Sequence, residues 1–468
     1  MNALHFCAGD GLFGDPMPLY YNGVYHIYYT KLYHSENRNL GWGHLVSKDM
    51  INFEEKPDPF AENDPGAPVN TGCVFAHNGK FHAYYYGMAP SGKPAIFHAK
   101  SDNPDSFSYS GDICFVRPEK HYRQDDTWRD PFVFYHKGEF HMVFCAKAPD
   151  TTGADNCAGV IGHAVSKDLK QWQCLPPLSP KGLGGHPECP QIFSAGKRLG
   201  LVYYWRETRF RTAKNLYGPW KRARVLSPDG FDFNAARILN DGRRDLLLGW
   251  ISKGAVNADD RPWGGYMLFP RELTFGRGHT PQTRFAEEVY ALFSHKTDLT
   301  PQNAVCFGDG WRRTESTMAV NAAIGGRSAA WRNLPERALI TATVKMKKPG
   351  VVLFLLGAHQ SNWLGEAADL ENGTMLEIST AEGIARIYRH GYWQAFPNTA
   401  ATPMPKNLKT LSVEILTDGN ILEVNINRKR TMAVLLTEPC GGNLVLRVED
   451  TSAHIQNFAV YTEPQNQN

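Results

Sequence analysis

The sequence predicts an all-β protein, a five-bladed β-propeller followed by a β-sandwich. Two observations carry this prediction: a hairpin signal that recurs five times, and a run of alternating strands that continues after the repeat stops. With 468 residues, the chain is also too long for one small core. We therefore expect two domains, a propeller over residues 1–295 and a sandwich over residues 296–468.

The repeat consists of a short apolar run, a tight turn with glycine and a second strand-like run. The turn glycines are spaced 56, 59, 58 and 46 residues apart, and they are Gly23, Gly79, Gly138, Gly196 and Gly242. Asn-Gly and Asp-Gly between alternating apolar residues are the strongest short-range hairpin signals. Units of about 45 to 60 residues with several short strands are typical of propeller blades.

Polar residues stand eight positions before the turn glycines, and they are Asp15, Thr71, Asp130, Glu188 and Asn234. Equivalent positions of successive blades surround one axis, so the three carboxylates are expected to converge there. The alternative is that each acid caps a turn or pairs with an arginine of its own blade. Three acids in register favour a shared site.

Two longer segments also repeat each other, WGHLVSKDMINFE (42–54) and IGHAVSKDLKQWQ (161–173). Each is predicted to be an outer strand with a Ser-Lys-Asp turn and a structural role. From about residue 305 the pattern changes to short alternating strands, among them ALITATVKM, VVLFLLG, TMLEIST and NLVLRVED. The Asp418-Gly419-Asn420 turn within 411–428 predicts a hairpin, and the whole set predicts an accessory sandwich.

Composition excludes several classes of partner. The net charge is +3 and the basic runs are short, so no nucleic acid is expected. No stretch approaches 18 apolar residues, and the N-terminus does not resemble a signal peptide. Nine scattered cysteines without metal spacing indicate reduced thiols. We expect a cytoplasmic protein with no membrane partner, and the oligomeric state is left open.

Three converging acids can serve glycoside hydrolysis or metal binding. Two carboxylates flanking a glycosidic bond hydrolyse it, and a third raises the pKa of the proton donor through like charge. Tryptophans near the repeats, such as Trp42, Trp205 and Trp263, suit sugar stacking, although blades also pack with aromatics. Calcium would need six to eight oxygen ligands, and DxDxDG loops are absent. No metal or other cofactor is expected.

At these residues the chain resembles glycoside hydrolase family 32, the invertase, levanase and inulinase family. The resemblance lies in the Arg-Asp-Pro triplet at 129–131, the Glu-Cys pair at 188–189 and the PREL segment at 270–273. It implies a five-bladed propeller, a sandwich and hydrolysis with retention. It also implies that Asp15 is the nucleophile, Glu188 the acid/base and Asp130 the stabiliser of the transition state. Arg129 would then lie beside Asp130 and keep it ionised.

The chain departs from the family pattern around these acids. Gly14 stands where the family has Asn, Thr30 replaces a common Gln, and His186-Pro187 replaces the residues before the Glu-Cys pair. His186 either contacts the sugar or its leaving group, or fills the space of a missing Trp. The residues expected to bind substrate are Arg129, Trp42, Thr71, His186, Asn234 and Thr30.

The predicted function is retaining hydrolysis of terminal β-fructofuranosyl linkages in small carbohydrates. A cytoplasmic location favours short substrates, because polymers do not cross a membrane intact. Three alternatives stay open: a fructosyltransferase, an inverting arabinofuranosidase-type propeller, and a sugar-binding propeller without catalysis. The last would be expected to lack one of the three acids, and the sequence contains all of them.

Overall fold

The computed structural model divides the chain into two compact units. Unit 1 comprises residues 1–4, 228–232 and 282–468, and unit 2 comprises 5–227 and 233–281. The structure describes every residue except 1–3, 35–39, 61–68, 110, 126, 150–156, 180–181, 224, 226, 231, 254–262, 358–372, 390–399 and 465–468. The predicted all-β class is confirmed: helix in the described residues is limited to α1 (Glu287–Ala291), η2 (Arg277–His279) and η3 (Pro301–Asn303).

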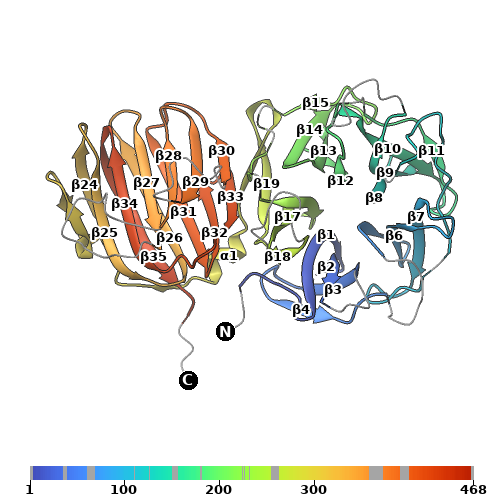
Figure 1. Cartoon of the computed structure of the whole chain (residues 1–468), viewed down its shortest axis with the longest axis horizontal. Coiled ribbons are helices and arrows are strands. Elements are labelled where there is room, and N and C mark those ends of the chain that lie inside the picture. The colour runs from blue at the N-terminus through green and yellow to red at the C-terminus, as the bar shows by residue number, and fades with distance from the viewer. Residues whose placement is uncertain are drawn as a thin grey trace. The chain divides into compact units, whose positions relative to one another are not determined.

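Unit 2 contains four antiparallel sheets, which Figure 1 shows arranged in a ring. The largest has nine strands in the order β20-β19-β17-β18-β1-β2-β3-β4, with β16 paired to β17; its edge strand β20 begins in unit 2 and belongs to unit 1 from Gln282 onward. Their bounds are β1 (Gly11–Tyr21), β2 (Val24–Tyr33), β3 (Leu40–Ser47), β4 (Phe53–Lys56), β16 (Asn234–Asn240), β17 (Asp245–Ser252), β18 (Gly265–Met267), β19 (Arg271–Gly276) and β20 (Thr280–Phe285).

The other three sheets of unit 2 follow the chain in order. They are β5 (Gly72–His77), β6 (Lys80–Met88) and β7 (Pro94–Ser101); β8 (Trp128–His136), β9 (Glu139–Lys147), β10 (Gly159–Ser166) and β11 (Gln173–Leu175); and β12 (Glu188–Ala195), β13 (Arg198–Tyr204), β14 (Thr208–Ala213) and β15 (Lys221–Arg222). Strands β8 and β12 lie toward the inside of the ring (Figure 1).

The predicted hairpins are confirmed at all five turns, where each inner strand pairs antiparallel with its successor. In the β1–β2 turn, Asn22 and Gly23 both have positive φ, at 48° and 82°. This is the backbone of a type I′ turn, which matches the twist of the flanking strands. The Asn-Gly signal in the sequence therefore reports a real conformational requirement.

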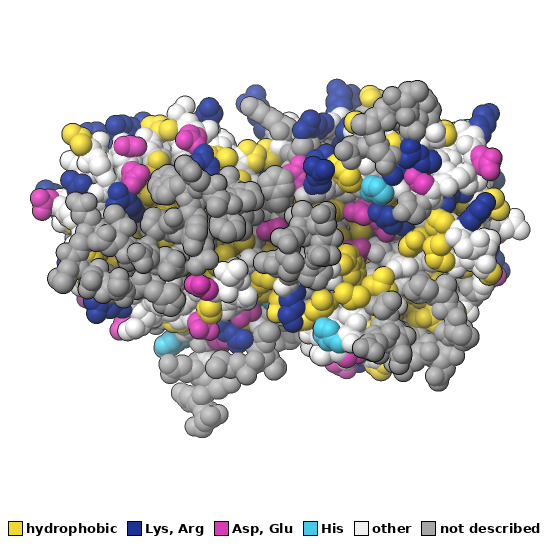
Figure 2. Space-filling model, viewed as in Figure 1, with side chains coloured by type: hydrophobic (Ala, Val, Ile, Leu, Met, Phe, Trp, Pro, Cys, Tyr) yellow, Lys and Arg dark blue, Asp and Glu magenta, His cyan; other side chains and the backbone are white. Residues whose placement is uncertain are grey.

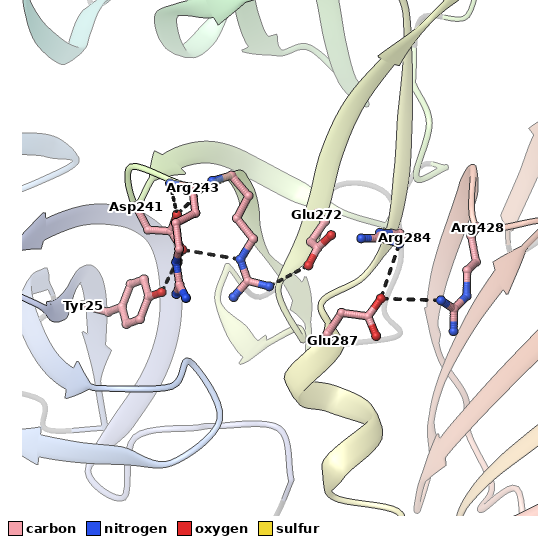
Figure 3. Close-up of polar contacts among 8 residues, drawn as sticks. Tyr25, Asp241, Arg243, Glu272, Arg284, Glu287 and Arg428 are labelled. Atoms are coloured by element: carbon pink, nitrogen blue, oxygen red, sulfur yellow. Dashed lines mark hydrogen bonds and ion pairs between the residues drawn. The ribbon is translucent and has the colours of Figure 1, made fainter.

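The first strand of unit 2 is joined to a strand near the end of the unit. Strand β1 pairs with β18 through Phe13 and Gly265, so residues far apart in the chain share one sheet. Side chains reinforce the junction (Figure 3): Tyr25 donates to Asp241 at 2.9 Å, and Arg244 bridges Asp241 and Glu272 at 3.4 and 2.6 Å. Backbone pairing and this charge network together hold the ends of the unit in place.

The repeated Ser-Lys-Asp segments form matching turns. Ser47 and Asp49 accept backbone N–H groups after β3, and Ser166 and Asp168 do the same after β10. The structural role predicted for these segments is thus visible in their hydrogen bonds.

Unit 1 is a β-sandwich of two antiparallel sheets around one core. One sheet has eight strands, and their bounds are β21 (His295–Lys296), β23 (Arg312–Arg313), β24 (Thr317–Ala322), β26 (Arg337–Met346), β31 (Thr410–Asp418), β32 (Ile421–Ile426), β33 (Arg430–Leu435) and β35 (Thr451–Thr462). The other has seven, and their bounds are β22 (Val305–Phe307), β25 (Arg327–Leu334), β27 (Val351–Leu356), β28 (Thr374–Ser379), β29 (Ile384–Arg389), β30 (Ala400–Pro403) and β34 (Gly442–Glu449).

The sandwich core combines buried side chains of both sheets, including Trp331 stacked on Phe458 at 4.2 Å. The predicted hairpin at Gly419 is confirmed, because β31 and β32 pair on either side of that turn. Helix α1 is tied to unit 1 by Glu287, which contacts Arg284 and Arg428 at 3.4 and 3.5 Å (Figure 3).

Candidate active site

Four inner strands of unit 2 begin with a β-bulge. The register slips between Phe13 and Pro16, Arg129 and Phe132, Glu188 and Gln191, and Asn234 and Arg237. Within three of these bulges a residue other than glycine has positive φ: Asp130 at 60°, Cys189 at 48° and Ala235 at 47°. A bulge bends the strand and re-aims its side chains, and it is common beside active sites.

The three acids occupy different places in their bulges. Glu188 is the first residue of its bulge, Asp130 the second and Asp15 the third. Counting eight residues back from each turn glycine predicts equivalent positions, and the structure shows that this equivalence is only approximate. The extra residue of a bulge breaks the two-residue period of a strand, and the turns differ in where they place the glycine. The acids nevertheless come together.

Asp15 is buried and fully hydrogen-bonded at one edge of this cluster. Thr71 Oγ1 donates to Oδ2 at 2.7 Å, and Trp250 Nε1 donates to Oδ1 at 3.0 Å. Thr30 lies behind Thr71, with their hydroxyl oxygens 3.2 Å apart. Burial and the charge of Asp130 raise the pKa of Asp15 to about 6, against the opposing effect of the two hydrogen bonds.

Asp130 bridges to the neighbouring strand. Its Oδ2 accepts the backbone N–H of Cys189 at 3.0 Å, directly after Glu188 in the chain. Arg129 Nε lies 3.8 Å from the same oxygen. The hydrogen bond fixes the position of one carboxylate relative to the backbone that carries another.

Glu188 makes the shortest contact of the cluster. Arg129 Nη2 donates to its Oε1 at 2.5 Å, so Arg129 lies closer to Glu188 than to Asp130, the partner predicted for it. Burial raises the pKa of Glu188 to about 7, with Arg129 opposing and Asp130 and Asp15 adding to the rise. The site therefore contains two carboxyl groups that titrate near neutrality.

His186 contacts Arg129, the residue that also contacts Glu188. Its Nδ1 is 3.3 Å from Arg129 Nη2 and 3.4 Å from Thr127 Oγ1. Its ring stacks on Trp205 with centroids 5.9 Å apart. A Cβ at Gly184 would lie 2.3 Å from the Trp205 ring, so this glycine makes room for the indole. Figure 2 shows acidic, basic and histidine side chains gathered at the centre of the ring.

The departure at Gly14 has a steric cause. A Cβ at this position would lie 2.0 Å from Trp263, which packs edge-on against Trp250 at 5.5 Å. An Asn cannot occupy this place unless Trp263 moves. The Trp263 indole thus fills the space next to Asp15 in which the family resemblance implies an Asn side chain.

Other predicted substrate contacts lie deeper. Trp42 is fully buried, and its indole N–H donates to Asn70 O at 2.9 Å, so it has no exposed face for stacking on a sugar. Thr30 is also buried, and it supports Thr71. Asn234 is partly exposed, with its side chain held by Tyr204 and by the carbonyl of Trp250 at 2.7 and 3.2 Å.

Two residues near the acids were missed by the sequence analysis. Trp250 bonds Asp15 directly, and Arg237 is buried close enough to lower the pKa of Asp15. The sequence signal for Arg237 is a charged residue inside the apolar run AARIL. Nothing in a single sequence distinguishes such a residue from one that reaches solvent.

Among the described residues, the one group whose side chains could together hold a metal ion lies outside the acid cluster and consists of His26, His44 and Asp105. His26 Nδ1 lies 3.1 Å from His44 Nε2, and the same pairing recurs at His82–His98 and His141–His163, at 2.9 and 3.0 Å. Recurrence in three sheets indicates a packing motif in which the rings satisfy each other. All nine cysteines are free thiols.

The family model described as "Glycosyl hydrolases family 32 N-terminal domain" matches residues 5–284. The chain belongs to glycoside hydrolase family 32. It is therefore a glycoside hydrolase by family, and the acid cluster lies within the matched segment. No helix in the described part of the chain has the length and apolar character needed to cross a membrane.

Several curated relatives are similar to this family 32 chain. The sucrose-6-phosphate hydrolase of Escherichia coli is 24% identical, over 64% of this chain and 67% of that protein. That of Bacillus subtilis is 24% identical over 58% and 62%. The extracellular exo-inulinase of Aspergillus niger is 23% identical over 67% and 69%.

Solved structures share the fold along the whole chain. The sucrose-6-phosphate hydrolase of Lactobacillus gasseri superposes with a TM-score of 0.75 at 17% identity, covering 99% of this chain and 93% of that one. The fructan 1-exohydrolase IIa of Cichorium intybus gives 0.69 at 16% identity, covering 99% and 98%.

Proposed function

We propose that this family 32 protein hydrolyses terminal β-fructofuranosyl linkages of small carbohydrates with retention of configuration. The observation that carries the proposal is the cluster itself: buried Asp15 and partly buried Glu188, whose pKa values are raised to about 6 and about 7, beside a third acid. One carboxyl group held by two hydrogen-bond donors and another beside a guanidinium group suit a nucleophile and a proton donor working at the same pH.

The proposed reaction has two displacements. Ionised Asp15 attacks the anomeric carbon and the glycosidic C–O bond breaks, while protonated Glu188 gives its proton to the leaving oxygen. Glu188, now a carboxylate, then takes a proton from water, whose oxygen attacks the anomeric carbon and releases Asp15. Asp130, held by the N–H of Cys189, stabilises the positive charge that develops on the sugar ring.

The neighbours of Asp15 suit the nucleophile role. The hydrogen bonds from Thr71 and Trp250 use both carboxylate oxygens and favour the ionised form. Thr30 acts one step further away, by orienting Thr71. We propose that these two threonines and Trp250 position the nucleophile.

Arg129 and His186 define the proposed side of the leaving group. Arg129 contacts Glu188, the residue that would protonate the leaving oxygen, and His186 with Trp205 extends the surface beyond it. We propose that these residues, together with Asn234, contact the sugar or its leaving group. Relatives named sucrose-6-phosphate hydrolase and exo-inulinase support a fructoside as the substrate. Because Gly14, Thr30 and His186 depart from the family pattern, we expect the preferred leaving group of this chain to be unusual.

The architecture is proposed in more detail as five blades. The five hairpins of unit 2 each begin one group of strands, and the nine-stranded sheet would combine the first and last groups through the β1–β18 pair. We propose residues 1–295 as the catalytic domain and 296–468 as an accessory sandwich. We also propose a cytoplasmic location, which suits short substrates.

The test is sugar release from a panel of β-fructosides, β-fructosides phosphorylated on the leaving group and α-arabinofuranosides. Asp15→Asn and Glu188→Gln are each expected to lose activity by about 10³-fold or more while keeping the fold. Asp102→Asn and Glu119→Gln, both exposed, are the matched controls. Full activity of either site variant, or release from arabinofuranosides alone, would contradict the proposal.

A further inference from the structure

Arg237 is a buried cation beneath the carboxyl cluster. It is the last residue of the β16 bulge and only 1% exposed. Its Nη1 donates to the carbonyl of Pro190 at 2.7 Å, and its Nη2 donates to the carbonyl of Asp130 at 3.4 Å. The guanidinium also lies over the ring of Phe132, 5.5 Å from its centroid.

Both acceptors of Arg237 belong to bulges that carry acids. Asp130 is itself the positive-φ residue of the β8 bulge, and Pro190 follows the positive-φ Cys189 in the β12 bulge that begins with Glu188. Positive φ costs a residue with a side chain about 1 kcal/mol or more, so the surroundings must hold these bulges in place. The forked guanidinium connects one bulge to the other, and their acids with them.

The charge of Arg237 has no close carboxylate. Within the described part of the chain Arg237 forms no ion pair, and its Nε has no hydrogen-bond partner. A buried charge is costly unless other charges compensate it. The nearby charge is that of the acid cluster, and the influence is mutual, because Arg237 lowers the pKa of Asp15.

Counting the charges explains why one proton belongs in the cluster. Three carboxyl groups, Asp15, Asp130 and Glu188, share the site with two guanidinium groups, Arg129 and Arg237. The site is neutral when one carboxyl group is protonated and the other two are ionised. Retaining hydrolysis needs that same count, with a protonated donor and an ionised nucleophile.

We propose that Arg237 is a positioning residue that joins the bulges of Asp130 and Glu188 and supplies the second positive charge of the cluster. The inference rests on the proposed function for its catalytic meaning. The groups that face Asp15 are Asp130 from β8, Glu188 and Cys189 from β12, and Arg237 from β16. Burial raises the pKa of the Cys189 thiol and keeps it neutral, so Arg237 is the cation among them.

The experiment separates charge from shape at residue 237. Arg237→Gln and Arg237→Met remove the charge, Arg237→Lys keeps it without the fork, and exposed Arg222→Gln is the control. The readout is kcat/KM against pH. Because the nucleophile must be ionised, loss of the cation moves the acid limb to higher pH, by about one unit, which is about a tenfold loss of rate on that limb.

The two charge-free variants are expected to shift the acid limb, while Arg237→Lys and Arg222→Gln keep it at the wild-type pH. An unmoved limb in either charge-free variant would overturn the proposal, and so would an equal shift in Arg237→Lys. If neither charge-free variant folds, the Lys variant decides: a limb at the wild-type pH supports the proposal and a shifted limb overturns it.

A second readout needs no substrate. Carbon-13 NMR of Asp and Glu carboxyl groups reports the Asp15 titration directly, with Asp15→Asn identifying the signal. The same upward shift is expected in Arg237→Gln, and an unchanged titration would overturn the proposal. An enzyme that releases no fructose but shows this shift would refute the proposed function and leave the role of Arg237 standing.

Discussion

Two sets of buried ionisable side chains in unit 2 respond to burial in opposite ways. The histidine pairs have lowered pKa values, to about 3 for His44 and His163 and about 4 for His82 and His98. Asp15 and Glu188 have raised pKa values. Burial favours the neutral form in both sets, because it removes water from the charge.

The difference lies in what surrounds each set. In a histidine pair, one neutral ring satisfies the other, and no charge is needed. In the acid cluster two arginines lie among the three carboxyl groups: Arg237 opposes the rise in the pKa of Asp15, and Arg129 opposes the rise in the pKa of Glu188. Burial without counter-charges thus leaves a polar repeat structural, and added counter-charges make it reactive.

The largest expected effect comes from removing one charge of the acid cluster. Asp130→Asn keeps an acceptor for the N–H of Cys189 and loses the negative charge. Because that charge is proposed to stabilise the positive transition state, kcat is expected to fall by about 10²–10³-fold. Steady-state kinetics measure this, with circular dichroism to check the fold. Wild-type kcat would remove Asp130 from the proposed mechanism.

Breaking a histidine pair should affect stability instead of catalysis. His163→Ala leaves His141 Nδ1 without its ring partner and opens a cavity at a fully buried position. The expected loss is about 2–4 kcal/mol in the free energy of unfolding, measured by urea denaturation. Activity per folded molecule should be unchanged. The control variant His295→Ala, at an exposed position, should change neither the stability nor the activity. A large fall in kcat of the folded variant would contradict the structural role.

The two sets should also give the stability opposite dependences on pH. Histidines with lowered pKa bind protons more readily when unfolded, so their contribution is complete above pH 6.5 and is lost as the pH falls toward 3 to 4. Asp15 binds its proton more tightly when folded, so its contribution decreases as the pH rises from about 4 to about 6.

Asp15→Asn should therefore stabilise the protein in a defined range of pH. At pH 8 the free energy of unfolding of the variant is expected to exceed that of the wild type by about 3 kcal/mol, with the difference vanishing below about pH 4. Thermal unfolding at several pH values measures this, with Asp102→Asn as the exposed control. Equal stability of wild type and variant at pH 8 would show that the carboxylate carries no electrostatic cost.

The smallest expected effect concerns the hydrogen bond between β2 and the turn that joins β16 to β17. Tyr25→Phe removes only the hydroxyl that donates to Asp241, at a position where arginines also reach that carboxylate. The expected cost is about 1 kcal/mol, because Arg243 and Arg244 remain. Differential scanning calorimetry measures it, and a loss above about 3 kcal/mol would contradict the minor role expected for this hydrogen bond.

The sequence predicts the fold well because turn residues and the alternation of apolar residues determine the local backbone conformation. An Asn-Gly turn requires positive φ wherever it occurs, so the hairpin at Gly23 could be located without a structure. The alternating strands on either side of Gly419 are equally direct, since one face of each strand must be buried.

The site is less predictable because it depends on geometry between strands. Counting residues found the three acids but not the bulges that shift them. Arg129 is expected beside Asp130, where its Nε lies 3.8 Å from the carboxylate, but its shorter contact with Glu188 is not predicted. Trp42 follows the same logic: its sequence pattern fits a sugar platform, and only packing shows that it is buried. The role of Arg237 could not be predicted, because it depends on contacts among three strands, β8, β12 and β16.

The proposed mechanism depends most on Asp15 being the nucleophile and on Glu188 donating and then accepting the proton. Glu188→Gln incubated with β-fructosyl fluoride, whose leaving group needs no acid, tests this directly. Without a base for the second displacement, the sugar is expected to accumulate as an ester on the peptide containing Asp15, detected by mass spectrometry after acid quenching. A sugar attached to any other residue, or fructose released with inverted configuration and no adduct, would contradict the account.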